Sequence, residues 1–360
     1  MALLSRTGES LYWIGRYVER AENMARLLDT GRRMSAVPND ADDETSEWQS
    51  VLAGAGARYA FDQSHKDVTK QNVVDFIAFS QANPSSIVSC IAQARANARA
   101  IRTALTIDMW EALNEFWLEL RAKAPMRVGA GELGYFLDWV KKSCALFRGV
   151  ADSSQLRDDT HNFLRLGTFV ERADCTARLL DVKCYVFDDR DEPVSGSVDT
   201  FQWTVVLRAT SSLRAYKWAY GGGYDRANIV EFLTLNPYTP RSLAFCVERI
   251  SEHLNRLARL YAARHDSHEI CASIAAELNA SDVEAIFEGG LHEFLTRFIA
   301  RNNWLSTQIA RDYNFLSAAE TAGVDIAAES AAKPKSRTQE QTRVKQPLTA
   351  HQENKSAVAS

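Results

Sequence analysis

Hydrophobic residues recur along this chain at the spacing of an α-helix. In the first such segment they lie three or four positions apart and form one stripe. These residues are Leu11, Ile14, Val18, Ala21, Ala25 and Leu28. Comparable stripes run through Ile87–Leu105, Leu133–Phe147, Leu243–Tyr261 and Leu291–Leu305. No segment joins strict apolar/polar alternation to hairpin turn residues. The pattern therefore predicts an all-α protein with about ten to twelve helices.

The sequence of the first long helix occurs twice. Residues 11–29 read LYWIGRYVERAENMARLLD and residues 163–181 read FLRLGTFVERADCTARLLD, with ten of nineteen aligned positions identical. Shorter matches follow in the same order, such as Pro84–Ile91 with Pro240–Val247. Units of this size are longer than solenoid repeats, which run about 20–50 residues. We expect an internally duplicated helical bundle, with one helical repeat at residues 1–153 and a second at residues 154–316.

Two features mark boundaries along the chain. Asn83-Pro84-Ser85 and Thr239-Pro240-Arg241 place proline after a capping residue, so each predicts a helix start. Residues 317–360 are polar and almost without large apolar side chains. Such a segment buries too little surface to offset its ordering entropy, so we expect a disordered polar tail.

The composition is that of a globular protein, with 46% apolar and 24% charged residues. A net charge of −4 argues against a dedicated nucleic-acid surface. The six cysteines form no CxxC pair, which is typical of reduced, buried thiols. The first residues lack the charged and apolar regions of a signal peptide, and no apolar run of about 18 residues predicts a membrane span. These features favour a cytoplasmic protein.

Polar residues keep one register in both copies of the repeated helix. In each copy a glycine, two acidic residues and an arginine lie at i, i+4, i+7 and i+11, which forms one line beside the apolar stripe. These positions are Gly15, Glu19, Glu22 and Arg26 in the first copy, and Gly167, Glu171, Asp174 and Arg178 in the second, with Arg20 and Arg172 just off the line. We call these residues the polar seam. A glycine inside a helix costs about 1 kcal/mol relative to alanine, so its presence twice indicates the close approach of a backbone or a ligand.

The polar seam allows a structural and a functional interpretation. Glu22 with Arg26 and Asp174 with Arg178 are i, i+4 pairs in the favourable orientation. The remaining glutamates would then pair with arginines of neighbouring helices and hold the two repeats in register. Alternatively, the carboxylates bind an amine or act as general bases, and the arginines bind a carboxylate or phosphate.

A second group of arginines follows one helical face. Arg95, Arg99 and Arg102 lie three or four positions apart, directly before Trp110 and Asn114. Such a face is usually solvated or paired with acidic neighbours. If it instead faces the polar seam, it would form a pocket for an anion.

Recognised cofactor and metal motifs are missing from the sequence. His265 and His268 have the spacing of half a metal site, but this spacing is common by chance and the first copy has no matching histidine. The Glu-x-x-His motif of di-iron bundles does not occur, nor does a P-loop, GxGxxG or GxSxG motif. We therefore predict no metal and no cofactor.

Four segments resemble the bacterial Alpha-E family, a predicted all-helical family named for a repeated Glu-Arg motif. They read LLSRTGESLYWIGRYVERAENMARLLD, ARANARAIRTALTIDMWEALN, FLRLGTFVERADCTARLLD and PRSLAFCVERI, and the resemblance spans about residues 1–316. It implies no specific enzymatic activity. The resemblance does imply partner proteins, because family members accompany a circularly permuted ATP-grasp ligase and often a transglutaminase-like cysteine peptidase.

Three functions follow as hypotheses. The first is a helical accessory protein that works with an ATP-grasp carboxylate–amine ligase in making or modifying a peptide or amino-acid conjugate. The second is an enzyme that uses the polar seam for ligation, transfer or hydrolysis of an amide-like bond. The third is a scaffold without a small-molecule site.

Overall fold

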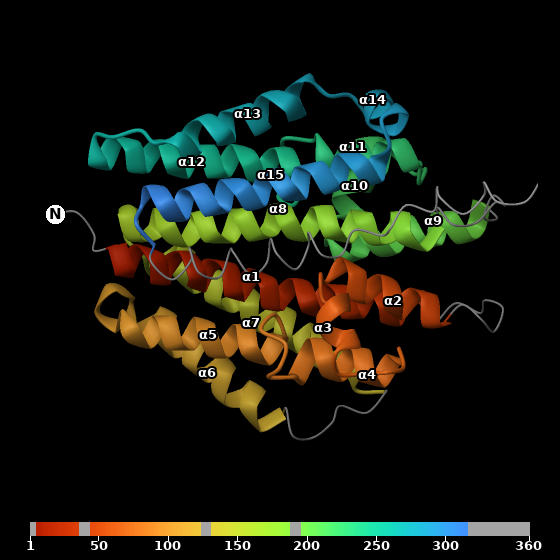
Figure 1. The fold of residues 1–360 in the computed structure, drawn as a ribbon, viewed down its shortest axis with the longest axis horizontal. Coiled ribbons are helices and arrows are strands. Elements are labelled where there is room, and N and C mark those ends of the chain that lie inside the picture. The colour runs from red at the N-terminus through yellow and green to blue at the C-terminus, as the bar shows by residue number, and fades with distance from the viewer. Residues whose placement is uncertain (1–4, 36–43, 124–130, 188–195, 316–360) are drawn as a thin grey trace, which may run out of the picture.

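The computed structural model describes residues 5–35, 44–123, 131–187 and 196–315. In these ranges the regular elements are all helical, so the predicted all-α class is confirmed (Figure 1). They comprise fifteen α-helices, three of which have only five or six residues. This number exceeds the predicted ten to twelve because such short helices are too brief to show an apolar period. The tail predicted at residues 317–360 lies outside the described ranges.

Two long helices form the centre of the molecule. α1 (Ser5–Met34) and α8 (Asp159–Phe187) pack along each other in the middle of the view in Figure 1. The predicted apolar stripe of α1 is buried, but so are most of its other residues, including Glu19 and Glu22. The polar seam is therefore enclosed within the protein and is not the solvated side of an amphipathic helix.

Each central helix is covered by two further helices, with a third outside them. On α1 these are α5 (Ile87–Ala100), α7 (Leu133–Ser154) and the outer α6 (Ile107–Lys123), and on α8 they are α12 (Leu243–Tyr261), α15 (Leu291–Asp312) and the outer α13 (Asp266–Ala280). α2 (Glu44–Gly54) and α9 (Gly196–Ala209) each contact both central helices. The buried apolar residues of both predicted repeats form one continuous core. The duplication itself stays a prediction.

The remaining helices are short and lie between the long ones. They are α3 (Arg58–Asp62), α4 (Lys70–Val74), α10 (Leu213–Tyr220), α11 (Arg226–Thr234) and α14 (Val283–Glu288), with a π-helical turn at Asp75–Phe79 and a 3-10 turn at Arg102–Ala104. Among the described residues, no helix is both long and apolar enough to span a membrane.

The predicted starts of α5 and α12 were slightly wrong. Ser86 caps α5 by accepting a hydrogen bond from the Ser89 N–H at 3.1 Å, and Ser242 caps α12 by accepting one from the Phe245 N–H at 3.0 Å. The prolines lie in the turns before these caps. A serine hydroxyl satisfies an otherwise free N–H of the first turn, which explains why the serine marks the boundary.

The cysteines that the structure describes have the predicted character. Cys90, Cys144, Cys175, Cys246 and Cys271 are free and buried. Burial raises the pKa of the Cys90 and Cys246 thiols to about 12, even though nearby arginines oppose the shift. These thiols stay protonated at neutral pH and act as small core residues.

Candidate functional site: a buried seam of glutamates and arginines

α1 and α8 cross at a pair of glycines. A Cβ atom on Gly15 would collide with the carbonyl oxygen of Leu164, and one on Gly167 would collide with the carbonyl oxygen of Tyr12. The group that each glycine admits is therefore the backbone of the opposite central helix. The close approach predicted from these mid-helix glycines is confirmed.

Next to the crossing, Glu171 of α8 binds two arginines of α1. Arg20 donates from Nε to Oε1 at 2.6 Å and from Nη2 to Oε2 at 3.1 Å. Arg16 donates from Nε to Oε2 at 2.8 Å. The Glu171 side chain is only 2% exposed. Serines complete this end of the polar seam, because Arg16 also donates to Ser306 and Arg20 to Ser85.

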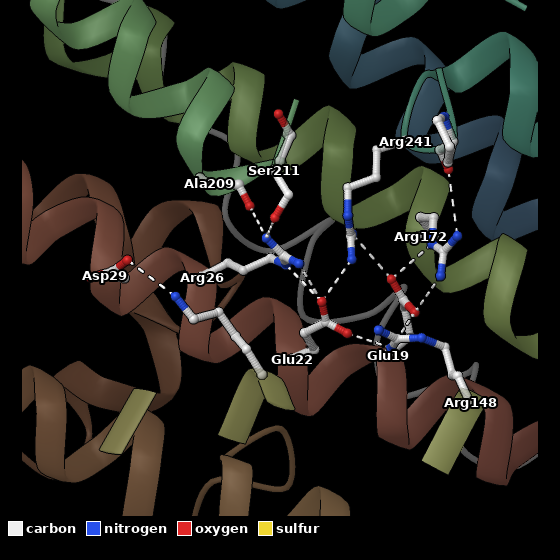
Figure 2. Close-up of polar contacts among 12 residues, drawn as sticks. Glu19, Glu22, Arg26, Asp29, Arg148, Arg172, Ala209, Ser211 and Arg241 are labelled. Carbon is white, nitrogen blue, oxygen red and sulfur yellow. Dashed lines mark hydrogen bonds and ion pairs between the residues drawn. The ribbon is translucent and has the colours of Figure 1, made fainter. Parts of the chain in front are cut away.

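Glu19 of α1 lies in the corresponding position and binds three arginines (Figure 2). Arg172 of α8 donates from Nε to Oε1 at 2.9 Å and from Nη2 to Oε2 at 3.0 Å. Arg148 of α7 donates from Nη1 to Oε2 at 3.2 Å. Arg241, in the turn before α12, places Nη1 3.1 Å from Oε1. Glu19 thus joins three separate elements.

The two Glu-Arg dipeptides are bound reciprocally. Glu19 of α1 accepts from Arg172 of α8, and Glu171 of α8 accepts from Arg20 of α1, each through a two-pronged contact. Bidentate guanidinium–carboxylate pairs fix both distance and orientation. The helices are therefore held in one register by their own repeated motif, as the structural interpretation of the polar seam requires.

The other predicted seam residues form pairs within their own helices. Arg26 donates from Nε to Glu22 at 2.9 Å, and Arg178 donates from Nε to Asp174 at 2.8 Å. Glu22 also accepts from Arg241 at 2.9 Å, which links it to the Glu19 cluster. Both expected i, i+4 pairs are present.

Opposing effects set the pKa values of the buried carboxyl groups. Burial by itself would raise the pKa of Glu19, but Arg172, Arg148 and Arg241 together hold it well below its usual range. The same competition lowers the pKa of Glu171 to about 2, since Arg20 and Arg16 outweigh its burial. A general base works best with a pKa near the operating pH. These glutamates are instead charged at neutral pH and poorly matched to that role.

A small cleft opens beside the polar seam between α1, α7 and α8. It is lined by Gly15, Val18, Glu19, Phe147, Arg148, Ala151, Leu164, Arg165 and Thr168. Gly15 at the helix crossing and Ala151 of α7 are among the lining residues. The walls of this small recess are mainly apolar.

The second predicted arginine group lies elsewhere. Arg95 donates from Nε to Asn114 of α6 at 2.8 Å, and the Arg102 guanidinium lies 5.1 Å from the Trp110 ring centre. Arg99 is exposed. Among the described residues, none of the three contacts the polar seam, so they cannot extend it into a pocket. Anion binding on this outer face stays a prediction.

The two histidines with metal-site spacing, His265 and His268, lie at the start of α13. His268 accepts a hydrogen bond on Nδ1 from the His265 N–H at 3.1 Å, which caps the start of α13. Within the described ranges, no group of three or more His, Cys, Asp or Glu side chains is arranged to hold a metal ion.

Four arginines of the site were not identified from the sequence. They are Arg16, Arg148, Arg165 and Arg241. Arg241 left a weak signal, because the second copy reads Pro-Arg-Ser where the first reads Pro-Ser-Ser. The others stand in ordinary helical positions, and their roles depend on contacts far away in the chain.

Fold and site together define a class: an all-helical protein whose two central helices are joined by buried, reciprocal Glu–Arg pairs. The chain belongs to the Alpha-E family, described as "a predicted alpha-helical domain with a conserved ER motif", whose model matches residues 3–314. This chain has Glu-Arg dipeptides at Glu19-Arg20, Glu171-Arg172 and Glu248-Arg249.

The chain is also similar to mycobacterial proteins whose names give no activity. The chain is 26% identical over 268 residues to an uncharacterized protein of Mycobacterium bovis, and equally so to an uncharacterized protein of Mycobacterium tuberculosis. Each alignment covers 70% of this chain but only 30% of the relative. The chain thus spans less than a third of the length of these relatives. No solved structure matches it.

Proposed function

We propose that this chain is an internally duplicated helical accessory protein of the cytoplasm. It works with an ATP-grasp carboxylate–amine ligase in making or modifying a peptide or amino-acid conjugate. A transglutaminase-like peptidase is a second partner in the same process. The polar seam organises the core that presents the binding surface, and it carries out no chemical step.

The burial, ion pairing and lowered pKa of the two glutamates support the proposal that the polar seam carries out no chemical step. Glu19 and Glu171 are buried, bound to two or three guanidinium groups each, and held with pKa values far below neutrality. To act as a base or nucleophile, either group would first have to leave these partners. Breaking such a buried pair costs about 3–5 kcal/mol.

The accessory role has two supports. The resemblance to the Alpha-E family implies the company of an ATP-grasp ligase. In addition, the mycobacterial relatives join a matching region to further chain that makes up most of their length. A domain that is covalently joined to other segments in its relatives suits a role beside a partner.

Affinity purification tests the partnership directly. The tagged chain is recovered from its native cells and the co-purifying proteins are identified by mass spectrometry, with an unrelated tagged helical protein as the control. We expect an ATP-grasp ligase in stoichiometric amount in the first sample alone. Recovery of the chain alone, as a monomer or homodimer, would contradict the accessory role.

A further inference from the structure

Two buried histidines meet where α12 packs on the first turns of α8. The rings of His161 of α8 and His253 of α12 lie edge to face with their centres 5.8 Å apart, and each residue is 5% exposed. His253 also stacks on Phe169 of α8, with 5.9 Å between the ring centres. Neither histidine belongs to the polar seam. We call these two residues the histidine pair.

The hydrogen bonds around the histidine pair indicate where its protons lie. Asn162 donates from Nδ2 to the Asp158 carbonyl oxygen at 2.7 Å, which directs its Oδ1 to His253. Nδ1 of His253 therefore donates to this oxygen at 2.9 Å. Arg157 places Nη1 2.9 Å from Nδ1 of His161. Because an arginine only donates and a protonated imidazole cannot accept, this contact requires a neutral His161.

Charged and titratable groups lie on every element around the histidine pair. They are Asp152 of α7, Arg157 and Asp158 in the turn before α8, Asp159 and Arg165 of α8, Arg249, Glu252 and Arg256 of α12, and His268 of α13. Asp152 and Glu252 are each shared by two of these arginines. Asp158 and Asp159 accept hydrogen bonds from a threonine and a tyrosine hydroxyl. Among the described residues, no carboxylate binds either imidazole, so a proton on the pair would be a buried charge without a counter-ion.

Burial makes both histidines reluctant to take up protons. Burial and the charge of Arg157 lower the pKa of His161 to about 4, although Asp152 opposes them. Burial and the neighbouring His161 lower the pKa of His253 to about 3. In the unfolded chain a histidine has a pKa of about 6.5, so the unfolded chain binds protons first. The stabilisation is therefore complete above pH 6.5 and is lost as pH falls from there towards 4.

We propose that the histidine pair is an acid-sensitive switch, which holds α12 against α8 while both rings are neutral and releases α12 when they are protonated. Protonation would place two cations side by side in the contact and would remove the acceptor that Arg157 uses. α12 lies along α8 in Figure 1, and His253 is in its interior. The turn that carries Arg241 leads into α12, so release of this helix would also loosen the arginines around Glu19. The switch acts within this chain and goes beyond the accessory role.

Urea denaturation of the full chain at pH 7 and at pH 5 tests the switch. Between these values each histidine should raise the equilibrium constant of unfolding about twentyfold, because it titrates here in the unfolded chain and not in the folded one. The buried glutamates contribute little in this range, since their unfolded pKa is about 4.3. The double variant His161→Gln with His253→Gln keeps an acceptor for Arg157 and a donor for Asn162. We expect it to lose most of this pH dependence.

His65→Gln is the matched control. It removes a histidine that packs on Phe61 of α3, so the loss of stability between pH 7 and pH 5 should stay as in the wild type. If the double variant does not fold, the single variants His161→Gln and His253→Gln serve. Each should remove about twentyfold of the pH effect on the equilibrium constant of unfolding.

Amide hydrogen exchange at the two pH values, corrected for intrinsic exchange rates, locates the release. Protection of α12 should fall about tenfold further than protection of α1. Three results would overturn the switch. They are a change in the unfolding constant of less than about fivefold, equal pH dependence in the wild type and the double variant, and an equal loss of protection in α1 and α12. None of these results bears on the ligase partnership, and loss of that partnership would leave the switch unaffected.

Discussion

At the scale of single residues, the charge state of the buried glutamates decides what the polar seam can do. Burial alone would favour the neutral acid, but the arginines around Glu22 and Glu171 overcome it and bring the pKa of each to about 2. The carboxylates therefore stabilise the fold only while they are charged. This ties the stability of the protein to pH in a defined range.

Acid should unfold the protein through these groups. In the unfolded chain a glutamate has a pKa of about 4.3, above the folded-state value of about 2, so the unfolded chain binds protons first. The stabilisation is complete above this unfolded value and is lost as pH falls from about 4.3 towards 2. Urea denaturation at a series of pH values measures it. A free energy of unfolding that does not change across this range would contradict the ion-paired state.

At the scale of elements, the crossing of α1 and α8 depends on two residues without side chains. Gly15 and Gly167 let each backbone reach the other, which brings Glu19 and Glu171 within reach of the opposite arginines. A wider crossing would separate these groups and leave charges buried without partners. The reciprocal pairs of the Glu-Arg dipeptides thus depend on the close crossing that the two glycines allow.

Alanine substitution tests the crossing. Gly15→Ala should lower the free energy of unfolding by about 3 kcal/mol, because the new methyl group meets a backbone carbonyl that cannot move alone. Gly149→Ala in α7 is the matched control: a Cβ there meets nothing within 4 Å, so the change should stabilise the helix by up to about 1 kcal/mol. Equal effects of the two variants in thermal or urea denaturation would refute the close crossing.

The sequence carried much of this element-level account. Helical spacing predicted the all-α class. The polar line through Gly15 and Glu19 predicted a close approach, and it left open whether the glutamates pair with arginines or form a binding site. The arginine partners from α7 and from the turn before α12 could not be predicted. A periodic pattern reports which face of a helix is buried, but it does not report which distant residue meets that face. Arg148 and Arg241 are therefore known only from the folded chain.

At the scale of the whole molecule, the polar seam joins parts of the chain that the sequence assigned to two repeats. α1 and α8 share one continuous core, and each supplies a glutamate to the other's arginine. The outer helices add further links, because Arg148 comes from α7 and Arg241 from the turn before α12. We propose that these buried pairs hold the molecule together and carry out no chemical step.

A double-mutant cycle on Arg20 and Glu171 tests that claim most directly. The free energy of unfolding in urea is measured for the wild type, Arg20→Gln, Glu171→Gln and the double variant. Arg20→Gln leaves Glu171 with Arg16 alone, and Glu171→Gln leaves both arginines without their carboxylate. Because each single change breaks a buried pair, it should cost about 3–5 kcal/mol, and the double change should cost clearly less than the sum. Single variants within about 0.5 kcal/mol of the wild type, or costs that simply add, would contradict the structural role of the seam.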